Sequence, residues 1–515
     1  MKSERLFRIL GLVDDDLIAD VDRPMQRNAR TAWRPWAAAA ACLVVLCGVG
    51  LLGQRMGDST GDAAGTDVAD PTGERDSGHE EGTTFLSYAG PVFPLTTVET
   101  DTGLTAERTV TWDFATGTYQ DGSPRQWGAA VTDATVLTNP TDTDVTVTAL
   151  YPFAGSLADL GTIQPAVTVD GAAADTTLYA GAYAGGFRDA GVDDGSTWNL
   201  DPPGSWTDYA ALLEDGGYLT QALGDGPTLD TPVTVYRFSY FEAPLKTYRA
   251  ATQAVEFTVD PSETTILSYG FNGLSQDPET GWRQYDYFVP DGARQSRTDL
   301  KLLVVLGEDI QDYTLQGYAN GACEEEIDGV SCTVTREETT LDAVLAEVCR
   351  QELDRADVSA RPGLDQLPLS LYQRAATEAL AAYGLPADSP ADRYADGRLD
   401  DFLWDVLAQD RVLYLALPVT VPAGGSVTVA ASFWKEPSYD YGCSGSENVD
   451  LQGYDLVTSL GSALDFTGQT AALVNTDTIE IVRQNLGFDL ENGVTEVSLG
   501  LAEPHYYLEI RPLDE

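Results

Sequence analysis

Histidines that could act as a base at neutral pH are few, because the chain contains only two, His79 and His505. A Ser-His-Asp or Cys-His arrangement requires an imidazole that is positioned as a base. His79 lies in a polar stretch, and no partner is arranged around His505 in the sequence. We expect His505 to lie at the start of a strand. Since no Walker A or H-E-x-x-H motif is present, the sequence predicts neither an enzyme nor a bound cofactor.

Carboxylates are abundant and suggest two further chemistries. The segment 392–401 carries four aspartates and partly resembles a calcium loop, but Tyr394 and Leu403 occupy positions that need oxygen ligands. Asp400 and Asp401 are interpreted instead as acids in the first turn of a helix, where they favour the helix dipole. Hydrolysis of envelope glycans by two carboxylates remains an alternative, although no spacing identifies the pair. No metal site is predicted.

Six cysteines divide by their place in the chain. Cys42 and Cys47 lie in an apolar stretch, and the other four lie beyond it, where disulfides can persist if that part is extracellular. Cys323 and Cys332 flank a predicted hairpin tip at 328–329 and are the favoured pair. Cys349 and Cys443 would then form a second pair, although four cysteines allow three pairings. A zinc site is disfavoured, because there is no C-x-x-C and no nearby histidine.

The segment Trp36–Gly53 (WAAAAACLVVLCGVGLLG) contains no charged residue. As a helix it would span about 27 Å, close to the roughly 30 Å of a bilayer core. A cleaved signal peptide is disfavoured, since 35 residues with six acids precede this segment. Four arginines lie between 23 and 34, and acids follow the segment. The positive-inside rule therefore predicts a single-pass protein of the bacterial cell membrane in contact with lipid, N-terminus cytoplasmic and C-terminal part extracellular.

The N-terminal segment 1–35 is expected to contain an amphipathic helix at 4–20, with Leu6, Leu10, Val13 and Leu17 on its apolar face. This helix either docks on a cytoplasmic protein or lies passively beside the membrane. The sequences MKSERLFRILGLVDDDLIADVD and TAWRPWAAAAACL resemble a group of uncharacterised bacterial single-pass membrane proteins, some with an anti-sigma-like layout. The resemblance covers about the first tenth of the chain and implies transmembrane signalling. The zinc motif of many anti-sigma domains is absent, since no Cys or His precedes Cys42.

The net charge of −51 comes almost entirely from residues after 35, which hold 23 bases against 75 acids. Such a surface repels phosphate backbones, so nucleic acid is excluded as a partner. Two interpretations remain: a well-solvated surface that resists aggregation, or recognition of a cation or a basic partner. The composition favours the first.

Beyond the membrane segment, the patterns predict a mainly β protein with an α insertion, built as immunoglobulin-like β-sandwich ectodomains. The expected divisions are a disordered acidic linker at 54–82, a β-sandwich at 83–295, and a second β domain at 296–515 with a helical insertion at about 340–410. We expect a hairpin formed by 131–138 and 145–151. Further strands are expected at 233–242, 254–259, 264–271, 412–417, 478–483, 494–499 and 506–510, and helices at 341–353, 369–383 and 399–408.

Two segments look alike. Residues 257–271 and 417–433 each read as strand, proline turn and strand, ending in an aromatic residue. Either the sandwich is duplicated, or this common pattern occurs twice by chance. The function that fits these features best is non-enzymatic recognition, sensing or scaffolding at the cell surface, with an envelope or cell-wall partner.

Overall fold

A computed structural model describes residues 89–118, 124–125, 127–183, 187–188, 199–200, 217–244, 251–289, 300–356, 361, 363–382, 384, 397–440 and 450–513. The chain divides into two compact units, Met1–Asp67 and Val68–Glu515, and all described residues belong to the second. This unit is mainly β, as predicted. Within the described ranges no helix is long and apolar enough to cross a membrane. The predicted span Trp36–Gly53, the helix at 4–20 and the linker at 54–82 lie outside those ranges.

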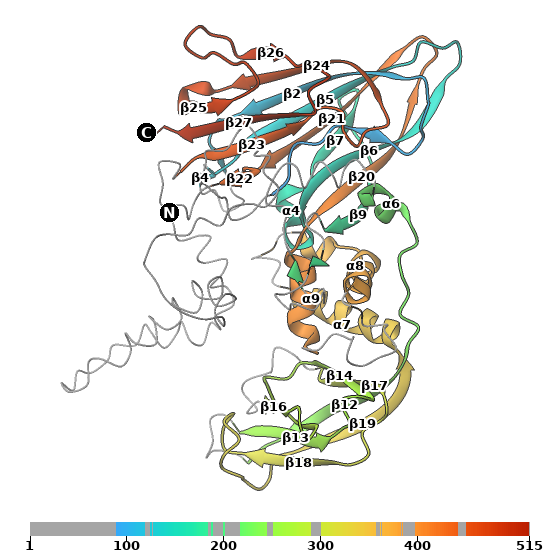
Figure 1. Ribbon diagram of the computed structural model, residues 1–515, viewed down its shortest axis with the longest axis vertical. Helices are drawn as coiled ribbons and strands as arrows, with labels where there is room; N and C mark the ends of the chain where they lie inside the picture. Colours follow the sequence, from blue (N-terminus) through green and yellow to red (C-terminus); the bar gives the residue numbers. More distant parts are fainter. Residues whose placement is uncertain are drawn as a thin grey trace, which may run out of the picture. The chain divides into compact units, whose positions relative to one another are not determined.

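The larger sandwich is built on a seven-stranded sheet (Figure 1). In order, its strands are β26 (Glu496–Ser498), β24 (Asp465–Val474), β2 (Thr105–Asp113), β5 (Ala129–Thr138), β21 (Ser426–Lys435), β7 (Ala166–Val169) and β8 (Ala172–Ala173). One four-stranded sheet that packs on it contains β1 (Thr96–Thr97), β6 (Val145–Ser156), β20 (Asp410–Val421) and β9 (Thr177–Tyr183). The other contains β22 (Tyr439–Asp440), β23 (Gln452–Val457), β27 (His505–Pro512) and β25 (Ile479–Gln484).

A smaller sandwich is inserted between β9 and β20 and consists of two four-stranded sheets. The first has the order β14 (Thr264–Tyr269), β17 (Leu302–Gly307), β12 (Pro232–Glu242) and β19 (Ser331–Thr340). The second has the order β15 (Gly273–Asp277), β16 (Trp282–Phe288), β13 (Thr252–Thr258) and β18 (Tyr313–Tyr318). Alternate residues of both sheets, among them Val305, Val255 and Tyr285, form the core between them.

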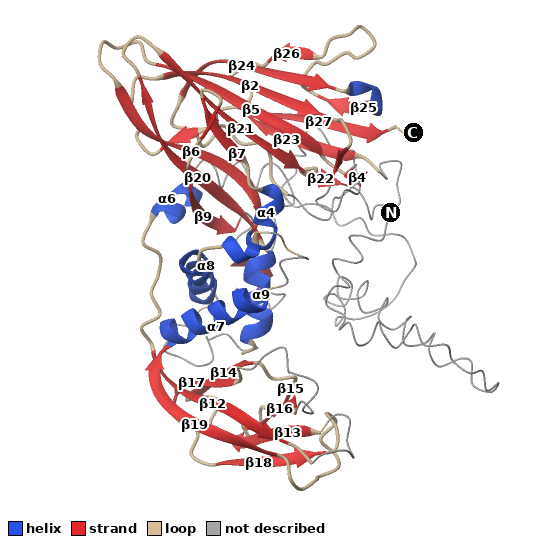
Figure 2. Ribbon diagram, turned by 180° about the vertical axis from the view of Figure 1, so that it is seen from behind, coloured by secondary structure: helices blue, strands red, loops and turns tan. Residues whose placement is uncertain are grey.

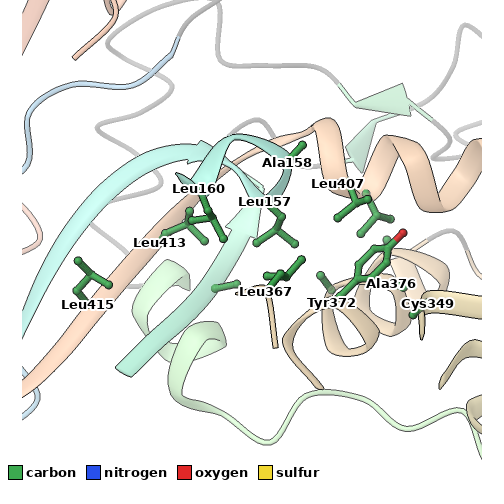
Figure 3. Packing of buried hydrophobic residues seen from close by; sticks show 14 of the residues in the cluster. Leu157, Ala158, Leu160, Cys349, Leu367, Tyr372, Ala376, Leu407, Leu413 and Leu415 are labelled. Carbon is green, nitrogen blue, oxygen red and sulfur yellow. The ribbon is translucent and has the colours of Figure 1, made fainter. Parts of the chain in front are cut away.

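Helices α7 (Leu341–Arg355), α8 (Leu369–Ala382) and α9 (Leu399–Ala408) follow the small sandwich and lie in the range of about 340–410 where helices are expected (Figure 2). Thr340 caps α7, since its hydroxyl accepts the Ala343 N–H. The apolar faces of these helices join a core that also contains side chains of both sandwiches. Figure 3 shows Leu160, Leu413 and Leu415 of the large sandwich in one cluster with Tyr372 of α8 and Leu407 of α9.

The predicted hairpin at 131–151 is wrong, although both strands exist as β5 and β6. β5 pairs with β2 and β21, and β6 pairs with β1 and β20, so the two strands belong to different sheets. Asn139 holds the turn between them, because its amide group donates to the carbonyls of Thr143 and Val421. A polar turn therefore carries the chain across the sandwich instead of folding it back.

The predicted boundary at residue 295 falls between β16 and β17, inside the small sandwich. Strands from both predicted domains pair with one another, as in β2 with β24 and β6 with β20. The chain enters the small sandwich before β12 and leaves it after β19 at the same place, where the Leu341 N–H donates to the Thr231 carbonyl. The arrangement is thus nested, with the small sandwich and helices α7, α8 and α9 inserted into the large sandwich, and not two domains in series.

The two similar segments correspond to β13–β14 and β20–β21. β13 and β14 belong to different sheets of the small sandwich, and β20 and β21 belong to different sheets of the large one. In each case the proline-containing turn connects the two sheets of a sandwich. The sequence similarity therefore has a shared structural role.

Candidate functional site

His505 is the first residue of β27, as predicted. Its Nε2 lies 2.7 Å from Asp455 Oδ1, and the side chains are 8% and 3% exposed. A histidine buried in this way cannot reach a substrate from solvent. Asp400 and Asp401 lie in the first turn of α9, as predicted, where Asp400 also accepts the Gly270 N–H at 2.9 Å.

The described cysteines, Cys323, Cys332 and Cys349, are all free thiols, so the predicted pair of Cys323 with Cys332 is not formed. The strands on either side of the supposed hairpin tip, β18 and β19, belong to different sheets. The side chain of Cys332 packs against the core cluster that contains Tyr287, whereas burial and nearby Asp286 raise the pKa of Cys323 to about 11. Asp286 and Tyr287 are consecutive residues of β16, so their side chains point to opposite faces of its sheet. Cys323, near Asp286, and Cys332, near Tyr287, therefore lie on opposite sides of that sheet.

Cys349 is fully buried in α7, and burial raises the pKa of its thiol well above the usual range. Its predicted partner Cys443 lies outside the described residues, as do Leu6, Leu10, Val13 and Leu17 of the predicted docking face. Within the described ranges, no three or more His, Cys, Asp or Glu side chains gather so as to hold a metal ion. None of the residues singled out from the sequence therefore assembles a site in the part of the chain that the structure describes.

The structure instead forms a cavity of about 450 Å³ at one end of the small sandwich, which we call the acidic cavity. Three turns build it: the one between β13 and β14, the one between β15 and β16, and the one after β17. Its lining includes four carboxylates and several small polar side chains, namely Thr258, Val259, Asp260, Pro261, Thr264, Glu279, Thr280, Glu308, Asp309 and Gln311. No lysine or arginine among the described residues lines it.

Two turns of the acidic cavity are organised by aspartates. Asp260 accepts hydrogen bonds from the Ser262 hydroxyl at 2.6 Å and the Ser262 N–H at 2.9 Å. Asp277 accepts from the Thr280 hydroxyl at 2.8 Å and the Glu279 N–H at 3.0 Å. These bonds favour the ionised form and lower the pKa of both carboxyl groups. At neutral pH the turns therefore carry full negative charge.

Two glycines allow the turns to approach the strands closely. Gly281 has φ +72°, and a Cβ there would lie 1.9 Å from the Val259 carbonyl oxygen. Gly307 has φ +93°, and its Cβ would lie 1.9 Å from the Glu263 carbonyl oxygen. Only glycine fits both the backbone conformation and the space.

A second cavity of about 350 Å³ shares Asp309 and Gln311 with the first, and we call it the tyrosine cavity. It is lined by Tyr236, Asp309, Ile310, Gln311, Tyr313, Val334 and Arg336. The rings of Tyr236 and Tyr313 meet edge to face, with centroids 5.9 Å apart. This cavity adds an aromatic wall next to the carboxylates of the acidic cavity.

Asp309 lines both cavities, and its charge is balanced by an ion pair with Arg336. It accepts hydrogen bonds from the Tyr236 hydroxyl at 2.9 Å and from Arg336 Nε at 2.8 Å. Burial and this bond to Asp309 raise the pKa of Tyr236 to about 12. The free negative charge of the acidic cavity is therefore carried by Asp260, Glu279 and Glu308, all of them exposed.

The chain has no recognised relatives in two comparisons with known proteins. No known family matches it. No curated protein sequence is significantly similar to it.

Proposed function

We propose that this chain is a non-enzymatic recognition protein of the bacterial cell surface, whose acidic cavity binds a cationic ligand. In this proposal Trp36–Gly53 anchors the chain in the membrane, and both sandwiches lie outside the cell. The observation that carries the proposal is the charge of the acidic cavity: three turns bring together carboxylates with no lysine or arginine among the described lining residues.

The energetics require a cation that contacts several carboxylates at once, as an organic or peptide cation with more than one positive group can. A carboxylate about 4 Å from an ammonium group contributes about 1 kcal/mol in water and about 4 kcal/mol near a protein surface. The exposed carboxylates keep most of their hydration, so each lies near the lower value, and several must act together. Screening by salt should weaken the binding.

Recognition fits these carboxylates better than glycan hydrolysis does. A glycosidase needs one carboxyl group with a raised pKa to protonate the leaving oxygen. Hydrogen bonds from Ser262 lower the pKa of Asp260 instead. A permanently ionised carboxylate is suited to holding a cation.

The proposal extends to architecture. Turns that gather at one end of a sandwich and bind a ligand are the arrangement used by immunoglobulin-like domains. We propose that the turns at this end of the small sandwich bind a ligand in the same way. The similarity concerns the architecture alone.

The test is calorimetric titration of spermidine and of the blocked peptide Gly-Lys-Gly-Lys-Gly into the full-length protein in detergent at low salt. Replacing Glu279→Gln and Glu308→Gln together should weaken binding by about tenfold or more, equivalent to about 1.4 kcal/mol. The matched control is Glu496→Gln with Glu503→Gln, which removes the same charge from exposed positions on the large sandwich. Equal losses in both variants would show that net charge alone attracts the ligand, and the proposed site would be wrong.

A further inference from the structure

The strand β18 is an edge strand whose second side is only partly occupied. One side pairs with β13 along its length. On the other side the chain itself adds a short segment, since Ile327 N–H donates to the Gly317 carbonyl and Ala319 N–H donates to the Glu325 carbonyl, both at 2.9 Å. This pairing covers the end of β18 and stops there.

These two bonds show which residues in the first half of β18 direct their backbone N–H and C=O groups away from β13. In an antiparallel ladder, alternate residues direct both their N–H and C=O groups to the same side. Since Gly317 and Ala319 face the outer side, Leu315 and Tyr313 do so as well. No backbone bond is formed there by the described chain, and Leu315 and Tyr313 are 37% and 40% exposed.

Three other edge strands in the described part of the chain, β19, β25 and β14, are protected. Arg336, Glu337 and Glu338 place charges on β19, and a register shift interrupts β25. β14 is covered where Ser268 N–H donates to the Gly397 carbonyl. β18 (YTLQGY) has no lysine, proline or bulge, so its open half is suited to accept another strand.

The open edge of β18 begins beside the two cavities. Tyr313, the first residue of β18, lines the tyrosine cavity, which shares Asp309 and Gln311 with the acidic cavity. A strand added along Leu315 and Tyr313 and continued past Tyr313 would reach the carboxylates within a few residues, at about 3.3 Å per residue.

We propose that the open half of β18 binds an extended basic peptide by strand addition, with a lysine or arginine of that peptide in the acidic cavity. The backbone groups supply affinity, and the cavities select the side chains. This inference rests on the proposed function for the choice of a basic residue, but the strand addition can be tested separately.

The experiment titrates three kinds of probe into the full-length protein: the blocked peptide Lys-Thr-Val-Thr-Val, two versions of it N-methylated at odd or even positions, and spermidine. In an added strand, either the odd or the even residues direct their N–H groups toward β18, so only one of the two methylated peptides loses these donors. We expect that version to lose about tenfold or more in affinity and the other to bind like the parent. Leu315→Pro, which removes an outward N–H, should weaken the peptide but not spermidine. Leu315→Ala keeps the N–H and is its matched control.

The outcomes separate the two proposals. Equal binding of both methylated peptides and the parent overturns strand addition and leaves the cation site standing. Phase-specific loss with no spermidine binding supports strand addition and contradicts the proposed function. If Leu315→Pro does not fold, judged by its thermal unfolding, the methylated peptides still decide the question on the wild-type protein.

Discussion

At the residue scale, buried charges in this acid-rich chain are held in specific pairs. Arg108 forms two bonds to Asp133, at 2.9 and 2.7 Å, and donates to the carbonyls of Phe93 and Val457. Tyr151 also donates to Asp133, at 3.1 Å. Such groups are costly to bury unless their polar atoms are satisfied, so they specify how the sheets meet.

Asp400 is a contrasting case, in which burial raises the pKa of the carboxyl group to about 6. The bond from Gly270 N–H acts in the opposite direction but is the smaller effect. Between about pH 4 and 6 the folded chain binds this proton and the unfolded chain releases it. The stability contributed here therefore falls as the pH rises through that window.

We predict that Asp400→Asn removes this dependence. The difference in unfolding free energy between pH 4 and pH 7 should change by about 1 to 3 kcal/mol relative to the wild type. Urea unfolding at both values of pH measures it. The control is Asp401→Asn, whose carboxylate is exposed and paired with Arg398 at 3.1 Å. If both variants show the same pH dependence as the wild type, the burial argument is wrong.

At the element scale, the turns that cross between sheets organise both the large sandwich and the site. Asn139 N–H donates to the Gly425 carbonyl and Gly424 N–H to the Thr141 carbonyl, so the turns after β5 and β20 support each other. In the small sandwich, the turns after β13 and after β17 also connect different sheets and line the acidic cavity, whereas the third turn, between β15 and β16, joins two paired strands of one sheet. Rigid strands thus position the carboxylates although the carboxylates themselves are in turns.

A pair of glycine substitutions tests whether the acidic cavity requires the close approach of Gly281 to the Val259 carbonyl. Gly281 and Gly493 have almost the same φ, +72° and +73°, but a Cβ meets the Val259 carbonyl at Gly281 and nothing within 4 Å at Gly493. Gly493→Ala should cost about 1 to 2 kcal/mol from backbone strain alone. Gly281→Ala should cost at least about 3 kcal/mol and weaken binding of the lysine peptide. Equal costs in chemical denaturation would contradict a role for the close approach.

At the scale of the whole molecule, one core connects the large sandwich, the helices and the small sandwich. Leu345 of α7 belongs to the same buried cluster as Leu415 of β20 and as Leu302 and Leu306 of β17. Val255, by contrast, belongs to the core that lies within the small sandwich alone. The described unit should therefore unfold as one body when the shared core is damaged.

We predict that Leu345→Ala, at a fully buried site, costs about 2 to 5 kcal/mol. Hydrogen exchange should then accelerate in both sandwiches, in β24 as well as in β13. Val255→Ala should accelerate exchange in the small sandwich alone. The shared core would be disproved if Leu345→Ala left β24 unchanged while β13 exchanged faster.

Local patterns in the sequence were enough to place most of the elements. A period-two pattern rich in β-branched residues located β5 and β6, strands were also expected where β12, β20 and β27 lie, and three- and four-residue spacing located α7, α8 and α9. These predictions succeeded because side-chain periodicity and helix boundaries depend on residues close together in the chain. The sequence does not single out the acids of the acidic cavity, Asp260, Glu279 and Glu308, and recognition of a cation or basic partner was the less favoured of two interpretations of the net charge.

Which strands pair and which turns meet depends on the tertiary structure. The hairpin at 131–151 and the pair of Cys323 with Cys332 both assumed that strands adjacent in sequence are adjacent in a sheet. In both cases the two consecutive strands lie in different sheets, whose apolar faces pack against each other. The acidic cavity and the open edge of β18 arise from the same long-range pairing. Sequence spacing carries no information about such pairing, because burial rewards any arrangement that covers the apolar faces.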